Sequence, residues 1–274
     1  MKVRLMSATP RAHRPIVAGN WKMHTTIAEA SNLAQEIVAA VAGIGGVDVV
    51  ICPPFVALTA VYEVIAGTPV QLGAQNVNAV AHGAFTGEVA WTMLQGLCSH
   101  VIVGHSERRG YYHETDEEVN EKVRAVLDAG MTPIACVGER LEQRDAGETA
   151  PFVAGQVRAV LAAVTPEAAR RIVIAYEPLW AIGTGRPATG TAAQEMAALI
   201  RGVVGEAYAA DVATALRIQY GGSVTGANAP EFAAQPDVDG ALVGGASLKP
   251  ADFAAIVRAF AGTGRLPHPP TPSP

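Results

Sequence analysis

Short apolar runs alternate along the chain with longer stretches in which apolar residues recur at helical spacing. Eight of the short runs are rich in β-branched and other apolar residues, which predicts strands that are covered on both faces. These runs span residues 16–20, 47–52, 71–75, 101–104, 132–137, 172–176, 217–220 and 240–243. Because the alternation continues without a linker, the pattern favours repeated strand–helix units around one parallel sheet.

The longer stretches predict helices at residues 26–41, 55–65, 116–129, 151–164, 191–205 and 250–260. Pro166 and Pro250 suit the first turn of a helix, where a missing N–H costs no hydrogen bond. Thr191 and Gln194 have the spacing of a capping box, so we expect a helix to begin there.

The fold that accommodates eight such units in about 250 ordered residues is a single (β/α)8 barrel with a closed, parallel, eight-stranded sheet. An open nucleotide-binding sheet would need a phosphate loop after its first strand. The glycines at 43–46 precede a strand instead, and the chain has no GxxxxGK[ST] motif. We therefore expect an α/β barrel over residues 15–261, between a flexible extension at 1–14 and a flexible Pro-rich tail at 262–274.

Composition supports a well-packed globular protein, because 50% of the residues are hydrophobic and only 16% are charged. The formal net charge of −5 argues against nucleic acid or an anionic membrane as a partner. No apolar run approaches the roughly 20 residues that cross a bilayer, and residues 1–14 lack the apolar centre of a secretory signal. These features favour a cytoplasmic protein. Its three cysteines, Cys52, Cys98 and Cys136, are expected to be reduced core thiols.

Reactive side chains follow the ends of several predicted strands. Asn20 and Lys22 come after the first strand, His105 after the fourth and Glu177 after the sixth. Each alone could be a loop or capping residue, but the carboxyl ends of all barrel strands meet at one face. A carboxylate, an imidazole and an ammonium group at that face would supply a base, an acid or electrophile, and a group that stabilises an oxyanion.

Glycines follow the last two predicted strands, in Gly221-Gly222-Ser223 and in Gly244-Gly245. Barrels commonly hold phosphate at this place through backbone N–H groups, so an acidic protein could bind an anion there without a basic patch. The glycine-rich segment 178–189 follows Glu177 directly. We interpret it as a lid that excludes water from the reacting atoms.

The chain resembles the triosephosphate isomerase family from about residue 15 to residue 260. The resemblance rests on GNWKM at 19–23, IVGHSERR at 102–109, AYEPLWAIGTG at 175–185, YGGSV at 220–224 and DGALVGGASL at 239–248. It implies interconversion of dihydroxyacetone phosphate and D-glyceraldehyde 3-phosphate through an enediolate, in glycolysis and gluconeogenesis. Neither a metal nor an organic cofactor is implied.

The resemblance also assigns roles to residues. Glu177 would move the proton between the two carbons, and neutral His105 would polarise the carbonyl and shuttle the hydroxyl proton. Lys22 and Asn20 would stabilise the oxyanion and contact the substrate. The groups implied to hold the phosphate are Gly183, Ser223, Gly244 and Gly245. Glu107 and Ser106 would support the catalytic groups.

The family works as a homodimer in which a long loop enters the neighbouring active site. The matching segment here is 75–88, with Gln75 at its start. By this match Thr86 would approach Asn20 of the partner subunit, and Glu88 would pair with Arg108 of the partner subunit.

Three segments depart from the family pattern: 76–82, Ala90-Trp91 and Arg186-Pro187-Ala188. Pro187 restricts one end of the lid because its φ is fixed. These departures leave open a related isomerase that acts on a tetrulose phosphate such as erythrulose phosphate. A non-catalytic binding barrel would be marked by loss of Glu177, His105 or Lys22, and none is lost. An aldolase-type barrel would need a lysine in a later strand, and the last four predicted strands contain none.

Overall fold

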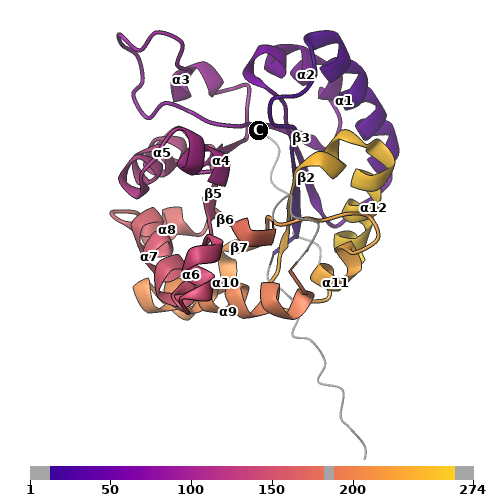
Figure 1. Ribbon diagram of the computed structural model, residues 1–274. Helices are drawn as coiled ribbons and strands as arrows, with labels where there is room; N and C mark the ends of the chain where they lie inside the picture. Colours follow the sequence, from indigo (N-terminus) through magenta and orange to yellow (C-terminus); the bar gives the residue numbers. More distant parts are fainter. Residues whose placement is uncertain (1–12, 182–187, 263–274) are drawn as a thin grey trace, which may run out of the picture.

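The computed structural model describes residues 13–181 and 188–262 and forms a closed barrel of eight strands (Figure 1). Each strand runs parallel to both neighbours, and β1 closes the barrel by pairing with β8 as well as β2. The strands are β1 (Ile16–Asn20), β2 (Asp48–Cys52), β3 (Val70–Ala74), β4 (His100–Val103), β5 (Thr132–Val137), β6 (Val173–Tyr176), β7 (Arg217–Tyr220) and β8 (Gly240–Val243). The predicted fold class and all eight strands are confirmed.

Buried side chains form two apolar layers, which explains why the strands read as continuous apolar runs. One layer fills the barrel and includes Ile16, Val50, Ile102 and Ile134. The other lies between the barrel and the surrounding helices. A strand residue therefore meets a packed environment whichever way it points.

Six helices match the predicted ones: α1 (Ile27–Val41), α2 (Leu58–Ile65), α5 (Asp116–Asp128), α7 (Thr149–Leu161), α9 (Gly190–Ala207) and α12 (Pro250–Ala261). The stretch expected at 55–65 begins with a 3-10 turn, η1 (Phe55–Ala57). Further short elements are α3 (Trp91–Leu94), α4 (Ser106–Tyr111), α6 (Leu141–Asp145), α8 (Pro166–Ala169), η2 (Leu179–Ala181), α10 (Ala210–Ala215), α11 (Ala229–Ala233) and η3 (Gly245–Leu248).

Helix caps confirm two predictions and correct one. Pro166 and Pro250 begin α8 and α12. The capping box at Thr191 and Gln194 is wrong, because α9 begins one residue earlier, at Gly190. Thr189 is its N-cap and accepts a hydrogen bond from the Ala192 N–H over 3.2 Å.

The cysteines are free and buried, as expected. Burial raises the pKa of the Cys98 thiol to about 12 and raises those of Cys52 and Cys136 as well. Within the described residues no helix is long and apolar enough to cross a membrane. Of the expected flexible ends, residues 1–12 and 263–274 lie outside the described residues, while the ring of His13 lies 3.1 Å from the buried Asp239 carboxylate.

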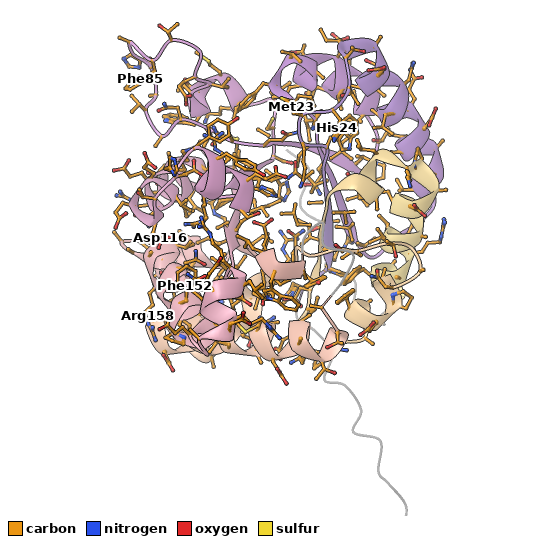
Figure 2. All side chains as sticks on the ribbon, viewed as in Figure 1. Met23, His24, Phe85, Asp116, Phe152 and Arg158 are labelled. Atoms are coloured by element: carbon orange, nitrogen blue, oxygen red, sulfur yellow. The ribbon has the colours of Figure 1, made fainter. Side chains whose placement is uncertain are left out.

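The segment between β3 and α3 projects from the body of the barrel (Figure 1). Phe85 lies at its far end (Figure 2), and 49% of its surface is exposed. This segment contains the whole loop, residues 75–88, that the resemblance places at a subunit interface.

Candidate active site

A cavity of about 390 Å³ opens where the barrel strands end, and most of the predicted catalytic and phosphate-binding residues line it. The lining includes Asn20, Lys22, His105, Glu177, Ser223, Gly244 and Gly245. They follow five different strands, so closure of the barrel is what brings them together. Gly183 and Pro187, and with them the centre of the expected lid, lie outside the described residues.

Glu177 occupies a buried position directly after β6, with 2% of its surface exposed. Its backbone N–H donates to the carbonyl of Val137 over 2.8 Å. Its carboxylate accepts hydrogen bonds from Ser106, one from the backbone N–H over 2.9 Å and one from the hydroxyl over 3.2 Å. Gly221 leaves room for this side chain, because a Cβ there would lie 2.9 Å from Glu177 Cγ.

His105 caps the start of α4 and faces Glu177. Its Nδ1 accepts the backbone N–H of Glu107 over 3.2 Å, which leaves the ring proton on Nε2. That Nε2 lies 3.0 Å from Glu177 Oε1. The imidazole is therefore oriented as an Nε2–H donor at the cavity wall.

The ionisations of Glu177 and His105 are coupled. Burial is the largest influence on the pKa of Glu177 and raises it, but the His105 ring and the two Ser106 donors together bring this pKa below its ordinary value. Burial likewise tends to lower the pKa of His105, and the Glu177 carboxylate outweighs it, so this pKa is raised. A carboxylate that stays ionised in a buried place is suited to act as a base.

Lys22 is held in the cavity by constraints at both ends of its side chain. Its φ is +54°, in the left-handed region, and its N–H donates to Asn20 Oδ1 over 3.0 Å. Gln75 Nε2 donates to the Lys22 carbonyl over 2.8 Å. Its ammonium lies 2.5 Å from Glu107 Oε1. Backbone strain of this kind persists only where surrounding contacts fix it, and it aims the ammonium at the cavity.

The glycines after β7 and β8 also line the cavity. A Cβ on Gly222 would lie 2.1 Å from the Tyr220 hydroxyl, so only glycine fits there. A Cβ on Gly245 would have no heavy atom within 4 Å, and η3 begins at this residue. Ser223 Oγ donates to the Ala181 carbonyl over 3.2 Å. These open backbone groups can accommodate a small anion.

Lys249 and Asp252 also line the cavity, and the sequence analysis missed them. They belong to the start of α12, directly after the glycines of β8. Their position shortly after Gly244-Gly245, the predicted phosphate-binding glycines, could have indicated that they line the site.

The residues expected at a subunit contact lie outside the cavity. Arg108 Nε contacts Glu114 within its own chain over 3.2 Å, and its guanidinium lies over the Tyr112 ring. Glu88 accepts a hydrogen bond from Asn78 Nδ2 over 3.2 Å. Thr86 is exposed on the projecting segment. In the described part of the chain no group of His, Cys, Asp and Glu side chains is arranged to hold a metal.

A closed (β/α)8 barrel with an ionised buried carboxylate, an Nε2–H imidazole and an ammonium at its mouth defines a barrel enzyme of the acid–base type. The triosephosphate isomerase family model matches residues 15–260. A triosephosphate isomerase from Chloroflexus aurantiacus is 52% identical over 244 residues, which are 89% of this chain and 98% of that protein. One from Carboxydothermus hydrogenoformans is 50% identical over 246 residues, or 89% and 98% of the two chains. The chain belongs to the triosephosphate isomerase family.

Proposed function

We propose that this protein interconverts dihydroxyacetone phosphate and D-glyceraldehyde 3-phosphate, with Glu177 as the base. The observation that carries the proposal is the placement of the Glu177 carboxylate, ionised and 3.0 Å from His105 Nε2, in a cavity that Gly244 and Gly245 also line. Curated relatives that carry the name triosephosphate isomerase support it.

In this mechanism Glu177 takes a proton from the carbon beside the carbonyl and returns it to the carbonyl carbon. The electron pair of the broken C–H bond becomes the C=C bond of an enediolate, and the carbonyl oxygen takes up the charge. His105 Nε2–H gives its proton to that oxygen, and the ring then takes the proton of the neighbouring hydroxyl, whose oxygen becomes the new carbonyl. The Lys22 ammonium and the Asn20 side chain stabilise the negative charge. The proton moves within one molecule, so no redox partner is needed.

His105 can serve this step as a neutral imidazole. Its Nδ1 already accepts the backbone N–H of Glu107 at the start of α4, and a positive charge is unfavourable at a helix N-terminus. The raised pKa of His105 depends mainly on the Glu177 carboxylate, with a smaller contribution from Glu107. When that carboxylate turns to the substrate carbon, the neutral form of the ring is favoured.

The phosphate would bind at Ser223, Gly244 and Gly245. The protein is acidic overall, with a formal net charge of −5, so local backbone N–H groups have to supply the attraction. Glycine permits this because a phosphate oxygen can approach the main chain closely.

The test of substrate identity is a parallel assay of dihydroxyacetone phosphate, D-glyceraldehyde 3-phosphate and erythrulose phosphates. Turnover of both trioses at a kcat/KM far above that of the tetruloses is expected. A preference for erythrulose phosphate would replace the proposed substrate while leaving the acid–base chemistry intact.

A homodimer is proposed as the working form, in the cytoplasm where glycolysis takes place. Phe85 on the projecting segment is 49% accessible, and Tyr111 and Tyr112 at the end of α4 are 79% and 70% accessible. Exposed apolar side chains of this kind can mark interaction surfaces. Light scattering should give a mass of two chains for the wild type and of one chain for Phe85→Asp. Phe152→Asp, which changes another exposed phenylalanine away from this segment (Figure 2), should leave the mass unchanged. A wild-type monomer would refute the dimer.

A further inference from the structure

A buried carboxylate lies beside the segment that carries Glu177. Glu139 follows β5 and has no exposed surface. Trp180 Nε1 donates to its Oε1 over 2.7 Å, and the Tyr176 hydroxyl lies 3.1 Å from both carboxylate oxygens. Tyr176 directly precedes Glu177, and Trp180 follows it by three residues. The Glu139 carboxylate thus joins the two ends of the short segment that presents the candidate base.

Backbone contacts hold the same segment against the loop after β5. The Glu177 N–H donates to the Val137 carbonyl over 2.8 Å, and the Leu179 N–H donates to the Glu139 carbonyl over 3.1 Å. Gly138 lies between these two bonds, where a Cβ would come within 1.8 Å of the Glu177 carbonyl oxygen. The position of Glu177 therefore depends on how firmly residues 137–139 and 176–180 are held together.

Arg144, on α6, covers this assembly from outside. Its guanidinium carbon lies 3.9 Å from the centre of the Trp180 ring, well within the range of a cation–π interaction. Its Nη1 lies 3.6 Å from Glu139 Oε1, and among the ion pairs of the described residues it is the cation that faces Glu139. About 40% of the Arg144 side chain is exposed, whereas the carboxylate beneath it is fully covered.

We propose that Arg144 is a positioning residue for Glu177. It neutralises Glu139 and covers Trp180, so the buried carboxylate can keep its bonds to Tyr176 and Trp180 on either side of the base. Without the guanidinium, Glu139 is a buried charge without its cation, which is unfavourable, and Trp180 loses its outer contact. This inference rests on the proposed role of Glu177.

The kinetic test compares Arg144→Met, which keeps an apolar side chain of similar reach, with Arg144→Lys, which keeps the charge. Small displacements of a catalytic group cost about tenfold to hundredfold in rate. We expect Arg144→Met to lower kcat by about tenfold or more with KM within about twofold, and Arg144→Lys to recover part of the loss. Arg140→Met is the matched control, because Arg140 is an exposed arginine at the start of the same helix. A wild-type kcat for Arg144→Met would overturn the proposal.

A double-mutant cycle tests whether Arg144 acts through Glu139. Glu139→Gln removes the buried charge but keeps an oxygen that can accept from Trp180 and Tyr176. Arg144→Met should therefore cost severalfold less in kcat in the Glu139→Gln background than in the wild type. Equal losses in both backgrounds would contradict a role through the carboxylate.

A spectroscopic readout is independent of activity. The chain has three tryptophans, Trp21, Trp91 and Trp180, so 5-fluorotryptophan labelling should give three 19F resonances, with Trp180 assigned by Trp180→Phe. Arg144→Met should shift the Trp180 resonance alone, and a global change would instead mean that the barrel had loosened. An unshifted Trp180 resonance would refute the proposal even if Glu177→Asp abolished activity. If Arg144→Met shifts the Trp180 resonance but Glu177→Asp keeps wild-type activity, the contact of Arg144 with Trp180 stands and the role of Glu177 as the base is refuted.

Discussion

The site depends on individual atoms that hold Glu177 ready as an ionised base. Ser106 contributes two donors to its carboxylate, His105 contributes a third contact, and the absence of a side chain at Gly221 leaves the space. The Ser106 hydroxyl and the space at Gly221 can each be changed by one substitution, so each gives a separate prediction.

Ser106→Ala removes the hydroxyl donor and keeps the backbone donor. Because that hydroxyl helps to hold the pKa of Glu177 down, its loss should raise this pKa. The base must be unprotonated, so activity falls as pH drops through the pKa of the free enzyme. The acid limb of the kcat/KM profile should therefore move to higher pH in the variant. A limb that stays in place would show that the hydroxyl does not influence the base.

Gly221→Ala should lower kcat/KM by at least tenfold, because the new Cβ would lie 2.9 Å from Glu177 Cγ and 3.1 Å from the Tyr176 carbonyl oxygen. Gly155→Ala is the matched control, since a Cβ there meets no heavy atom within 4 Å. Steady-state assays and melting curves of both variants are the measurement. Equal activities would mean that the close packing at Gly221 is not needed.

At the scale of elements, hydrophobic periodicity was sufficient for the strands and the long helices, and insufficient for the short ones. Four strands have the predicted bounds, at residues 16–20, 132–137, 217–220 and 240–243. Elements such as α4 and α6 are too short for a 3.6-residue period to develop. They form because loops after the strands must turn back along the barrel, which is a tertiary effect.

The cap of α9 shows the same limit, because the spacing of Thr191 and Gln194 predicted a start there, whereas the N-cap is Thr189. Thr189→Ala should destabilise the protein by about 1 kcal/mol, since Thr189 Oγ1 accepts the Ala192 N–H. Thr191 is exposed within the first turn, so Thr191→Ala should be neutral. Urea unfolding of both variants measures the two losses of stability. A larger loss for Thr191→Ala than for Thr189→Ala would support the capping box at Thr191.

The candidate site was predictable as a set because barrel closure gathers all strand ends at one mouth. Asn20, Lys22, His105 and Glu177 are polar residues directly after apolar strands, and this pattern is visible in one dimension. The contact of Arg144 with Trp180 joins residues far apart in the sequence without any periodic signal. Only packing of α6 on the loop after β6 reveals it.

At the scale of the whole molecule, the buried polar groups of the barrel make stability depend on pH. His100 has 4% of its surface exposed, and burial, assisted by Arg217, lowers its pKa to about 3. The unfolded chain binds a proton at His100 near pH 6.5 and the folded barrel does not. Stability is therefore full above that pH and falls below it, by up to about 1.4 kcal/mol per pH unit, until pH falls to about 3.

Unfolding free energies between pH 7 and pH 5 should accordingly have a shallower slope in His100→Gln than in the wild type. His105 contributes with the opposite sign, because its raised folded pKa gives stability that is lost as pH rises. Because His105 is present in both proteins, its contribution cancels when the slopes of the wild type and His100→Gln are compared. Equal slopes in the two proteins would show that His100 can be protonated in the folded barrel.

The most direct test of the central claim is the isomerisation of dihydroxyacetone phosphate by the wild type and by Glu177→Asp. The shorter side chain keeps a carboxylate but withdraws it from the substrate carbon. We expect rapid wild-type turnover and a kcat about a hundredfold or more lower in the variant, with KM little changed and melting temperature preserved. Wild-type turnover by Glu177→Asp would contradict the assignment of Glu177 as the base.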